Sequence, residues 1–278
     1  MRQSSVAINR QRITYLETTS GSSREDARPV VFVHGNSSSA KTWLPLMNGD
    51  FGQRFRCLAL DLPGHGKSDP ALDHADYSLP GYAAVLVGFA QELGVTDAIF
   101  VGWSLGGQIV LEAAPGLPEA GGFVIFGAPP VATPAQMGEA FLPHPAMGVL
   151  FSENVSADEA ELAAASFTAP GSPLALDEFV ADVLATDGAA RAALGASAGA
   201  GRFADELAIV AALRQPMAVL HGAEEQLISL DHLRKLDFPA LWRDEVQVIP
   251  ATGHAPHQEA PEAFAAVLAD FMADLADA

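Results

Sequence analysis

Residues 99–107 decide the fold of this chain, and they read Ile99-Phe100-Val101-Gly102-Trp103-Ser104-Leu105-Gly106-Gly107. An apolar run leads straight into a G-x-S-x-G motif, and residues 108–114 are typical of a helix that Pro115 and Gly116 end. A strand, a sharp turn and a helix form the context in which this motif presents a reactive serine. The sequence therefore predicts a buried strand, a tight turn and a helix at this point of an α/β sheet.

Ser104 is the candidate nucleophile of this turn. Glycines are needed at 102 and 106 because the backbone is crowded there and a Cβ would clash. The turn lifts Ser104 Oγ clear of the sheet edge and aims it at a substrate. The N–H of Leu105 begins the helix without a partner in it, so it can donate to an oxyanion. The alternative, a chance motif in a Gly- and Ala-rich chain, is disfavoured by the flanking elements.

The composition limits the class of protein. A length of 278 residues, 49% of them hydrophobic, suits one large α/β domain or a core with an inserted subdomain. A formal net charge of −19 argues against nucleic acids and anionic membrane surfaces as partners, because both need basic patches. A solvated acidic surface is the simpler interpretation of this charge. The single Cys57 lies in an apolar run and is expected to be buried and inert.

The N-terminal residues and the apolar runs bear on location. The first residues contain no apolar segment typical of a signal peptide, and no apolar run is long enough to span a bilayer. We therefore expect a cytoplasmic protein with neither a membrane nor a nucleic acid as its partner. The sequence leaves the oligomeric state open.

Short apolar runs recur along the chain and predict a mostly parallel sheet of about eight strands. Two half-exposed strands come first, and the later runs are continuous, as in central strands that are covered on both faces. The expected strands are residues 6–9, 12–18, 29–33, 57–60, 99–103, 122–128, 217–220 and 246–249. Helices are expected over residues 78–93, 108–114 and 261–275, and the alternation of the two element types predicts an α/β fold.

This alternation breaks between residues 131 and 215. The segment is rich in Ala, has helical patterns at 158–167, 176–184 and 203–213, and is interrupted by prolines. It predicts a helical lid, or cap, inserted in a core of residues 1–130 and 216–278. Candidates to line an apolar substrate pocket are Trp103, Phe141, Met147 and Phe167. For the lid residues among them, packing between lid and core is the simpler explanation.

A second loop, residues 34–39 with the sequence HGNSSS, follows the strand expected at 29–33. Loops of small residues at the carboxyl end of a central strand lie where α/β sheets bind ligands. The N–H of Asn36 could supply a second oxyanion donor beside that of Leu105. An ordinary turn with Ser and Asn caps is the alternative.

The general base must be found among eight histidines. His254 lies in a glycine-flanked loop just after the last expected strand, at the sheet edge where Ser104 is exposed. From there one ring nitrogen can reach Ser104 Oγ while the other faces a carboxylate, as a general base requires. His257 is the fallback. His221 ends a buried strand and is expected to pack there, and His65 is expected to hold its own loop by hydrogen bonds.

The acid partner of His254 is expected in the loop after residues 217–221, where Glu224 and Glu225 adjoin. Successive side chains point in different directions, so only one of the two can face His254. Glu225 is chosen, with Glu224 as the alternative. The order Ser104, Glu225, His254 is the chain order of the α/β-hydrolase triad. Since no H-E-x-x-H motif or cluster of His and Asp occurs, neither a metal nor another cofactor is expected.

With these motifs in place, the chain resembles the α/β-hydrolase superfamily over nearly its whole length. More narrowly, it resembles the metal-independent, quorum-quenching N-acyl-homoserine lactonases of that fold. The matching stretches are residues 34–39 (HGNSSS), 61–68 (DLPGHGKS), 102–107 (GWSLGG), 129–132 (PPVA) and 253–256 (GHAP). Most of these motifs are widespread in the superfamily, and residues 36–39, Trp103 and residues 129–132 narrow the resemblance.

The resemblance implies an α/β-hydrolase fold with a lid and a triad whose acid is a glutamate, at a loop position that falls on Glu225. The family places a lid tyrosine near the substrate, whereas Tyr15, Tyr77 and Tyr82 of this chain lie outside the predicted lid. The expected reaction is hydrolysis of a small-molecule ester or lactone, with N-acyl-homoserine lactone as the best candidate. The alternatives are a general carboxylesterase or perhydrolase, a carbon–carbon bond hydrolase and a non-catalytic ligand-binding relative of this fold.

Overall fold

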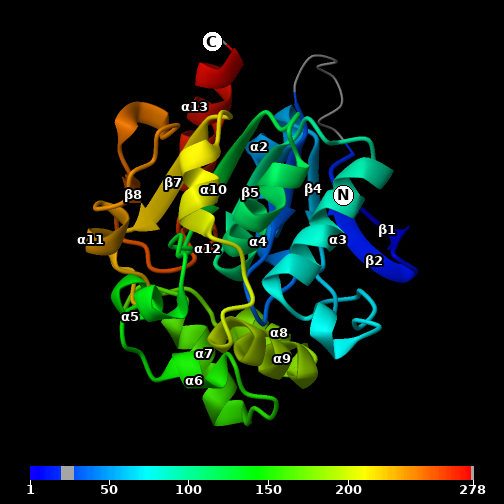
Figure 1. Ribbon diagram of the computed structural model, residues 1–278, viewed down its shortest axis with the longest axis vertical. Helices are drawn as coiled ribbons and strands as arrows, with labels where there is room; N and C mark the ends of the chain where they lie inside the picture. Colours follow the sequence, from blue (N-terminus) through cyan, green and yellow to red (C-terminus); the bar gives the residue numbers. More distant parts are fainter. Residues whose placement is uncertain (20–27, 277–278) are drawn as a thin grey trace.

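The computed structural model describes residues 1–19 and 28–276, and its centre is a single sheet (Figure 1). Within these residues the sheet has eight strands in the order β1-β2-β4-β3-β5-β6-β7-β8. The pairs β1–β2 and β2–β4 are antiparallel, and all other pairs are parallel. The strands are β1 Arg2–Ile8, β2 Gln11–Glu17, β3 Val30–Val33, β4 Cys57–Leu60, β5 Ile99–Trp103, β6 Gly122–Phe126, β7 Met217–Gly222 and β8 Gln247–Ile249. The predicted mostly parallel sheet of about eight strands is confirmed.

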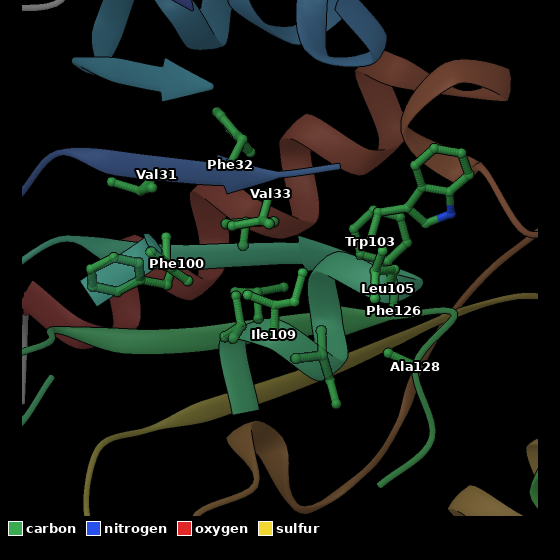
Figure 2. Packing of buried hydrophobic residues seen from close by; sticks show 14 of the residues in the cluster. Val31, Phe32, Val33, Phe100, Trp103, Leu105, Ile109, Phe126 and Ala128 are labelled. Carbon is green, nitrogen blue, oxygen red and sulfur yellow. The ribbon is translucent and has the colours of Figure 1, made fainter. Parts of the chain in front are cut away.

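The central strands are buried along their whole length. Strands β3, β4, β5 and β6 are buried at every position, because their apolar side chains are covered on both faces of the sheet. Figure 2 shows this packing for the side chains of β3 and β5, with Ile109 of the following helix against them. The first strand, β1, is half-exposed at the sheet edge. A two-residue turn at Asn9 and Arg10, both with positive φ, joins it to β2.

Helices lie on both faces of the sheet. On one face are α3 (Leu79–Glu92), α4 (Leu105–Ala113) and α10 (Glu206–Ala212), in front in Figure 1. On the other, α13 (Pro261–Ala276) places Phe271 behind Gly122 of β6. The shorter helices of the core are η2 Ala40–Trp43, α1 Leu44–Asn48, α2 Asp50–Arg54, η3 His74–Asp76, η4 Ala114–Gly116, α11 Leu230–Leu233, η6 Trp242–Asp244 and α12 Pro256–Glu259. None of the helices in residues 1–19 and 28–276 has the length and apolar character to cross a membrane.

A helical insertion between β6 and β7 forms the cap. Its elements are η5 Pro134–Gln136, α5 Met137–Ala140, α6 Ala146–Val149, α7 Ala157–Ser166, α8 Asp177–Ala185 and α9 Gly188–Gly199. In Figure 1 helices α5 to α9 gather below the sheet, at the carboxyl ends of its parallel strands. The next helix, α10, packs beside α4 in the core layer. The predicted cap boundaries at residues 131 and 215 stay a prediction. Helix α10 falls within that range but packs against the core helix α4.

Candidate active site

Ser104 lies at a strained turn between β5 and α4. Its φ and ψ are 54° and −120°, a conformation that residues other than glycine rarely adopt. The turn is held because Ser104 N donates to the carbonyl of Phe126 and Gly107 N donates to the carbonyl of Ser104, both at 2.8 Å. A Cβ at residue 106 would overlap the carbonyl oxygen of Val33. The structure thus has the strand, turn and helix that the G-x-S-x-G motif predicts, and Ser104 lines a cavity beneath the cap.

His254 and Glu225 form a buried hydrogen-bonded pair at the same cavity. His254 Nδ1 lies 2.7 Å from Glu225 Oε2, and the two side chains are 1% and 2% exposed. His254 Nε2 has no hydrogen-bond partner among the described residues. The histidine lines the same cavity as Ser104. One ring nitrogen is therefore fixed by a carboxylate while the other is free for proton transfer on the cavity side.

Glu225 is held in its ionised form. Burial by itself would raise the pKa of this carboxyl, but the charge and hydrogen bond of His254 and the Leu227 N–H outweigh burial and lower the pKa. The Leu227 N–H donates to Glu225 Oε1 at 2.7 Å. Glu224, the alternative acid, is exposed. The loop thus brings Glu225 to His254 and leaves Glu224 in solvent.

Gly127 fixes the place of the histidine ring. It follows β6 with a φ of 61°, in the left-handed region that favours glycine. A Cβ at this position would lie 2.6 Å from Cε1 and 2.9 Å from Nδ1 of His254. The ring therefore packs directly against the backbone of the strand that neighbours the strand of Ser104.

The other histidines weighed in the sequence analysis are buried and do not line the cavity. His257 Nε2 lies 2.7 Å from Thr42 Oγ1, and burial holds the pKa of His257 well below its ordinary value. Burial also lowers the pKa of His221. His65 Nδ1 donates to the carbonyl of Pro63 at 3.0 Å, and burial lowers its pKa to about 3. These three side chains are neutral packing groups at neutral pH.

The two candidate oxyanion donors, Asn36 and Leu105, both line the cavity. In the described part of the chain, neither backbone N–H donates to another protein group. The Asn36 side chain is engaged separately, because its Nδ2 donates to the carbonyl of Leu150 in the cap at 2.6 Å. This bond ties the loop after β3 to the cap.

The cavity has a volume of about 440 Å³ and a largely apolar wall. Its polar lining residues are Asn36, Ser104, Gln108 and His254, and none of the lining residues in the described ranges is charged. Phe141 and Met147 line it, as the sequence predicts. Trp103 and Phe167 are not among its lining residues, and substrate contact by any of the four residues stays a prediction. These two rings are 0% and 2% exposed and pack edge to face, 5.4 Å apart, beneath the site.

The sequence reasoning missed one wall of this cavity, which is helix α9. Six lining residues come from this helix: Ala192, Leu194, Gly195, Ala196, Ala198 and Gly199. Asp187 was the available signal, because its side chain accepts a hydrogen bond from Ala189 N and caps the helix. No group of three or more His, Cys, Asp or Glu side chains in the residues described is placed to hold a metal ion.

Comparison with known proteins identifies the family of the chain. The chain matches the Alpha/beta hydrolase family over residues 30–267. It belongs to this family. Among solved structures, the N-acyl homoserine lactonase AidH, as a mutant complexed with N-hexanoyl homoserine lactone, superposes with a TM-score of 0.92. The two are 36% identical, and the match covers 99% of this chain and 98% of that one.

More distant α/β hydrolases share the fold. An esterase from Rhodococcus sp. ECU1013 is 23% identical, with a TM-score of 0.81 over 99% of this chain and 98% of its own. A curated relative, the dihydrolipoyllysine-residue acetyltransferase component of the acetoin cleaving system from Pseudomonas putida, is 28% identical over 86% of this chain. The biotin biosynthesis bifunctional protein BioHC from Teredinibacter turnerae is 29% identical over 87% of this chain. The chain spans 61% and 44% of the lengths of these two curated relatives.

Proposed function

We propose that this α/β hydrolase is a serine hydrolase that opens the ring of N-acyl-homoserine lactones. The observation that carries the proposal is the His254 ring, held by Glu225 on one nitrogen and unpartnered on the other, in the cavity that Ser104 lines. Similarity to AidH over nearly the full length of both chains supports the choice of substrate. Ser104, His254 and Glu225 are then nucleophile, general base and orienting acid.

The first half of the reaction acylates Ser104. His254 Nε2 takes the proton from Ser104 Oγ while the oxygen attacks the lactone carbonyl carbon. The N–H groups of Asn36 and Leu105 stabilise the oxyanion, and loss of one such donor costs about 10²–10³ in rate. His254 then gives its proton to the ring oxygen as the ring C–O bond breaks. The opened homoserine stays attached to Ser104 through its acyl carbon.

The second half releases the product. His254 takes a proton from a water molecule, whose oxygen attacks the acyl carbon. The tetrahedral intermediate collapses, and Ser104 Oγ leaves and recovers the proton from His254. N-acylhomoserine is released as a carboxylic acid, which ionises at neutral pH and gives its proton to solvent. Throughout the cycle Glu225, with its lowered pKa, remains ionised and stabilises the imidazolium that forms twice.

The lining of the cavity favours an uncharged, apolar acyl chain. The polar groups gather at Ser104, and apolar side chains from the cap, among them Phe141 and Met147, form the rest of the wall. Without a charged lining residue in the described ranges, the cavity offers no ion pair to a dicarboxylate product of ring cleavage. This observation favours a lactone or ester over the substrates of carbon–carbon bond hydrolases.

The proposed chemistry uses no tyrosine. Tyr15, Tyr77 and Tyr82 are buried in the core and do not line the cavity. The Tyr77 hydroxyl instead donates to Asp187 at 2.7 Å, at the start of α9. The protons of the reaction are therefore assigned to His254 alone.

Proton release provides the test of this function. Opening a lactone at neutral pH yields a carboxylate and a proton, so a pH indicator follows turnover of N-hexanoyl-homoserine lactone. We expect kcat/KM for this lactone to exceed that for p-nitrophenyl acetate by roughly tenfold or more. An enzyme discriminates between two substrates by the ratio of their kcat/KM values, and the apolar cavity has room for the hexanoyl chain. Rapid hydrolysis of the ester with no proton release from the lactone would assign the chain to the carboxylesterases instead.

A further inference from the structure

Two of the three tryptophans pack against the same histidine ring and differ at the indole nitrogen. Trp43 and Trp103 are both fully buried, with rings 4.6 and 4.8 Å from the ring of His257. The Nε1–H of Trp43 has no hydrogen-bond partner within the described ranges. The Nε1–H of Trp103 donates to the backbone carbonyl of His254 at 2.8 Å. The chain thus contains two fully buried tryptophans that pack on one histidine ring, and among the described residues only Trp103 has a hydrogen-bond partner for its indole N–H.

The hydrogen bond of Trp103 joins the strand of the nucleophile to the loop of the base. Trp103 is the last residue of β5 and directly precedes Ser104, at the start of α4 (Figure 2). The loop of His254 is held from other sides as well. Ala255 N donates to the carbonyl of Phe167 in the cap at 2.7 Å. Trp103 adds an anchor from the same strand end that carries Ser104.

The ring of Trp103 is itself fixed in place. Phe167 packs against it edge to face at 5.4 Å, and the ring of His254 lies 5.8 Å away. A buried carbonyl that loses its donor is left unsatisfied, so the backbone would shift to find another partner. Because backbone position sets the direction of a side chain, such a shift moves the His254 ring relative to Ser104.

We propose that Trp103 is a positioning residue whose indole N–H holds the backbone of His254 so that Nε2 stays aligned with Ser104 Oγ. Trp103 lies outside the cavity lining, so it acts through His254 and not through the substrate. The proposal rests on the proposed function only in taking Ser104 and His254 as nucleophile and base. It does not depend on the substrate being a lactone.

The test compares Trp103→Phe with Trp43→Phe. Both variants replace a fully buried indole by a smaller ring, and only Trp103→Phe removes a hydrogen bond. The readout is the rate at which a fluorophosphonate probe phosphonylates Ser104. In this reaction Ser104 Oγ attacks phosphorus, fluoride leaves, and His254 takes the serine proton. Intact-protein mass follows the reaction, with Ser104→Ala as the blank.

We expect Trp103→Phe to react about 10- to 100-fold more slowly than the wild type, because misplacement of a reacting group by about 1 Å costs up to roughly that factor. Trp43→Phe should react within about threefold of the wild type, because no hydrogen bond is lost. In substrate assays Trp103→Phe should lower kcat by the factor seen with the probe and leave KM unchanged. Equal slowing in both variants, or a wild-type rate in Trp103→Phe, would overturn the proposal.

A second form of the experiment covers a Trp103→Phe variant that does not fold. Biosynthetic replacement of tryptophan by benzothienylalanine puts sulfur in place of every indole N–H and keeps the ring shape. Trp242 also loses a bond, to Asp274, and the variant Asp274→Ala controls for it. Slow phosphonylation of the analogue-containing chain supports the proposal, and an unchanged rate refutes it. A wild type that reacts with the probe but opens no lactone would refute the proposed function alone.

Discussion

Two buried carboxyl groups, Glu225 beside His254 and Glu206 at the base of the cap, have pKa values shifted in opposite directions. Glu225 faces His254 and the Leu227 N–H, and its pKa is lowered despite burial. Glu206 is fully buried, and desolvation raises its pKa well above the ordinary value. Its carboxyl accepts one hydrogen bond, from Val131 N at 2.9 Å.

The neighbours of each carboxyl explain the difference. A histidine that can carry positive charge offsets the desolvation of Glu225. Glu206 instead lies near two acids, Glu112 and Asp205, which raise its pKa further. Burial alone therefore does not decide ionisation. The surroundings of Glu225 favour its charged form, whereas those of Glu206 disfavour it. Glu206 accepts a hydrogen bond from Val131 N at its carboxyl and donates one to the carbonyl of Val131 from its backbone N–H.

The largest effect on activity is expected at Glu225. Glu225→Gln keeps the shape of the side chain but removes the charge and favours the wrong tautomer of His254. We expect kcat to fall by roughly 10³- to 10⁴-fold, as for loss of the charged acid in other triads. Glu224→Gln, one residue away and exposed, is the matched control and should leave kcat unchanged. If the two variants lost activity to the same extent, Glu225 would not be the acid.

Gly127→Ala tests whether the histidine ring needs its close backbone neighbour. The added methyl would press on Cε1 and Nδ1 of His254 and would also strain a residue with positive φ. We expect a loss of about 10- to 100-fold in kcat. Gly171→Ala has the same kind of strain, with a φ of 78°, and its Cβ meets nothing within 4 Å. The control should lose stability only, and kcat losses of equal size would show that strain, not the ring contact, matters.

The raised pKa of Glu206 predicts a pH effect on the stability of the fold. Because the pKa of Glu206 is raised in the folded state, the contribution of this carboxyl to folding stability is fully present below its ordinary pKa of 4.5. This contribution is lost as pH rises, since the carboxyl ionises first in the unfolded chain. Above that pH the wild type should become progressively less stable for as long as the folded carboxyl stays protonated and the unfolded one is ionised. Glu206→Gln should abolish this loss in urea titrations between pH 5 and pH 8. Parallel stability curves for variant and wild type would contradict the assignment.

The smallest effect is expected in the apolar wall that the cap contributes. Gly199 of α9 lines the cavity, and a Cβ there meets nothing within 4 Å. Gly199→Leu should shorten the acyl site and lower kcat/KM for dodecanoyl relative to butanoyl homoserine lactone by about 3- to 10-fold, since each buried methylene is worth about 0.8 kcal/mol. Gly138→Leu, at an exposed cap position outside the lining, should leave this ratio unchanged. A changed ratio in both variants would exclude a local effect of α9.

The sequence predicted the core far better than the cap, for physical reasons. Continuous apolar runs such as Val30–Val33 mark central strands, and strand ends gather Ser104, Glu225 and His254 at one edge. Helix α9 escaped because Gly and Ala give it little amphipathic pattern, although Asp187 caps it. The helix predicted at 203–213 begins only at Glu206, after the cap residue Asp205.

The side chain of Trp103 shows a second limit of sequence reasoning. Trp103 directly precedes Ser104 along the chain, but successive residues of a strand point to opposite faces. The Trp103 ring packs against the rings of Phe167 and His257 and does not line the cavity. Which face a residue takes at a strand end depends on tertiary packing, which spacing alone does not reveal.

The most direct test of the central claim is the mass of the product formed from N-hexanoyl-homoserine lactone by the wild type and by Ser104→Ala. The account predicts that the wild type adds one water to the lactone, that acid reverses the change, and that Ser104→Ala forms none above the uncatalysed rate. Equal ring opening by Ser104→Ala, or release of free homoserine lactone with hexanoic acid, would contradict it.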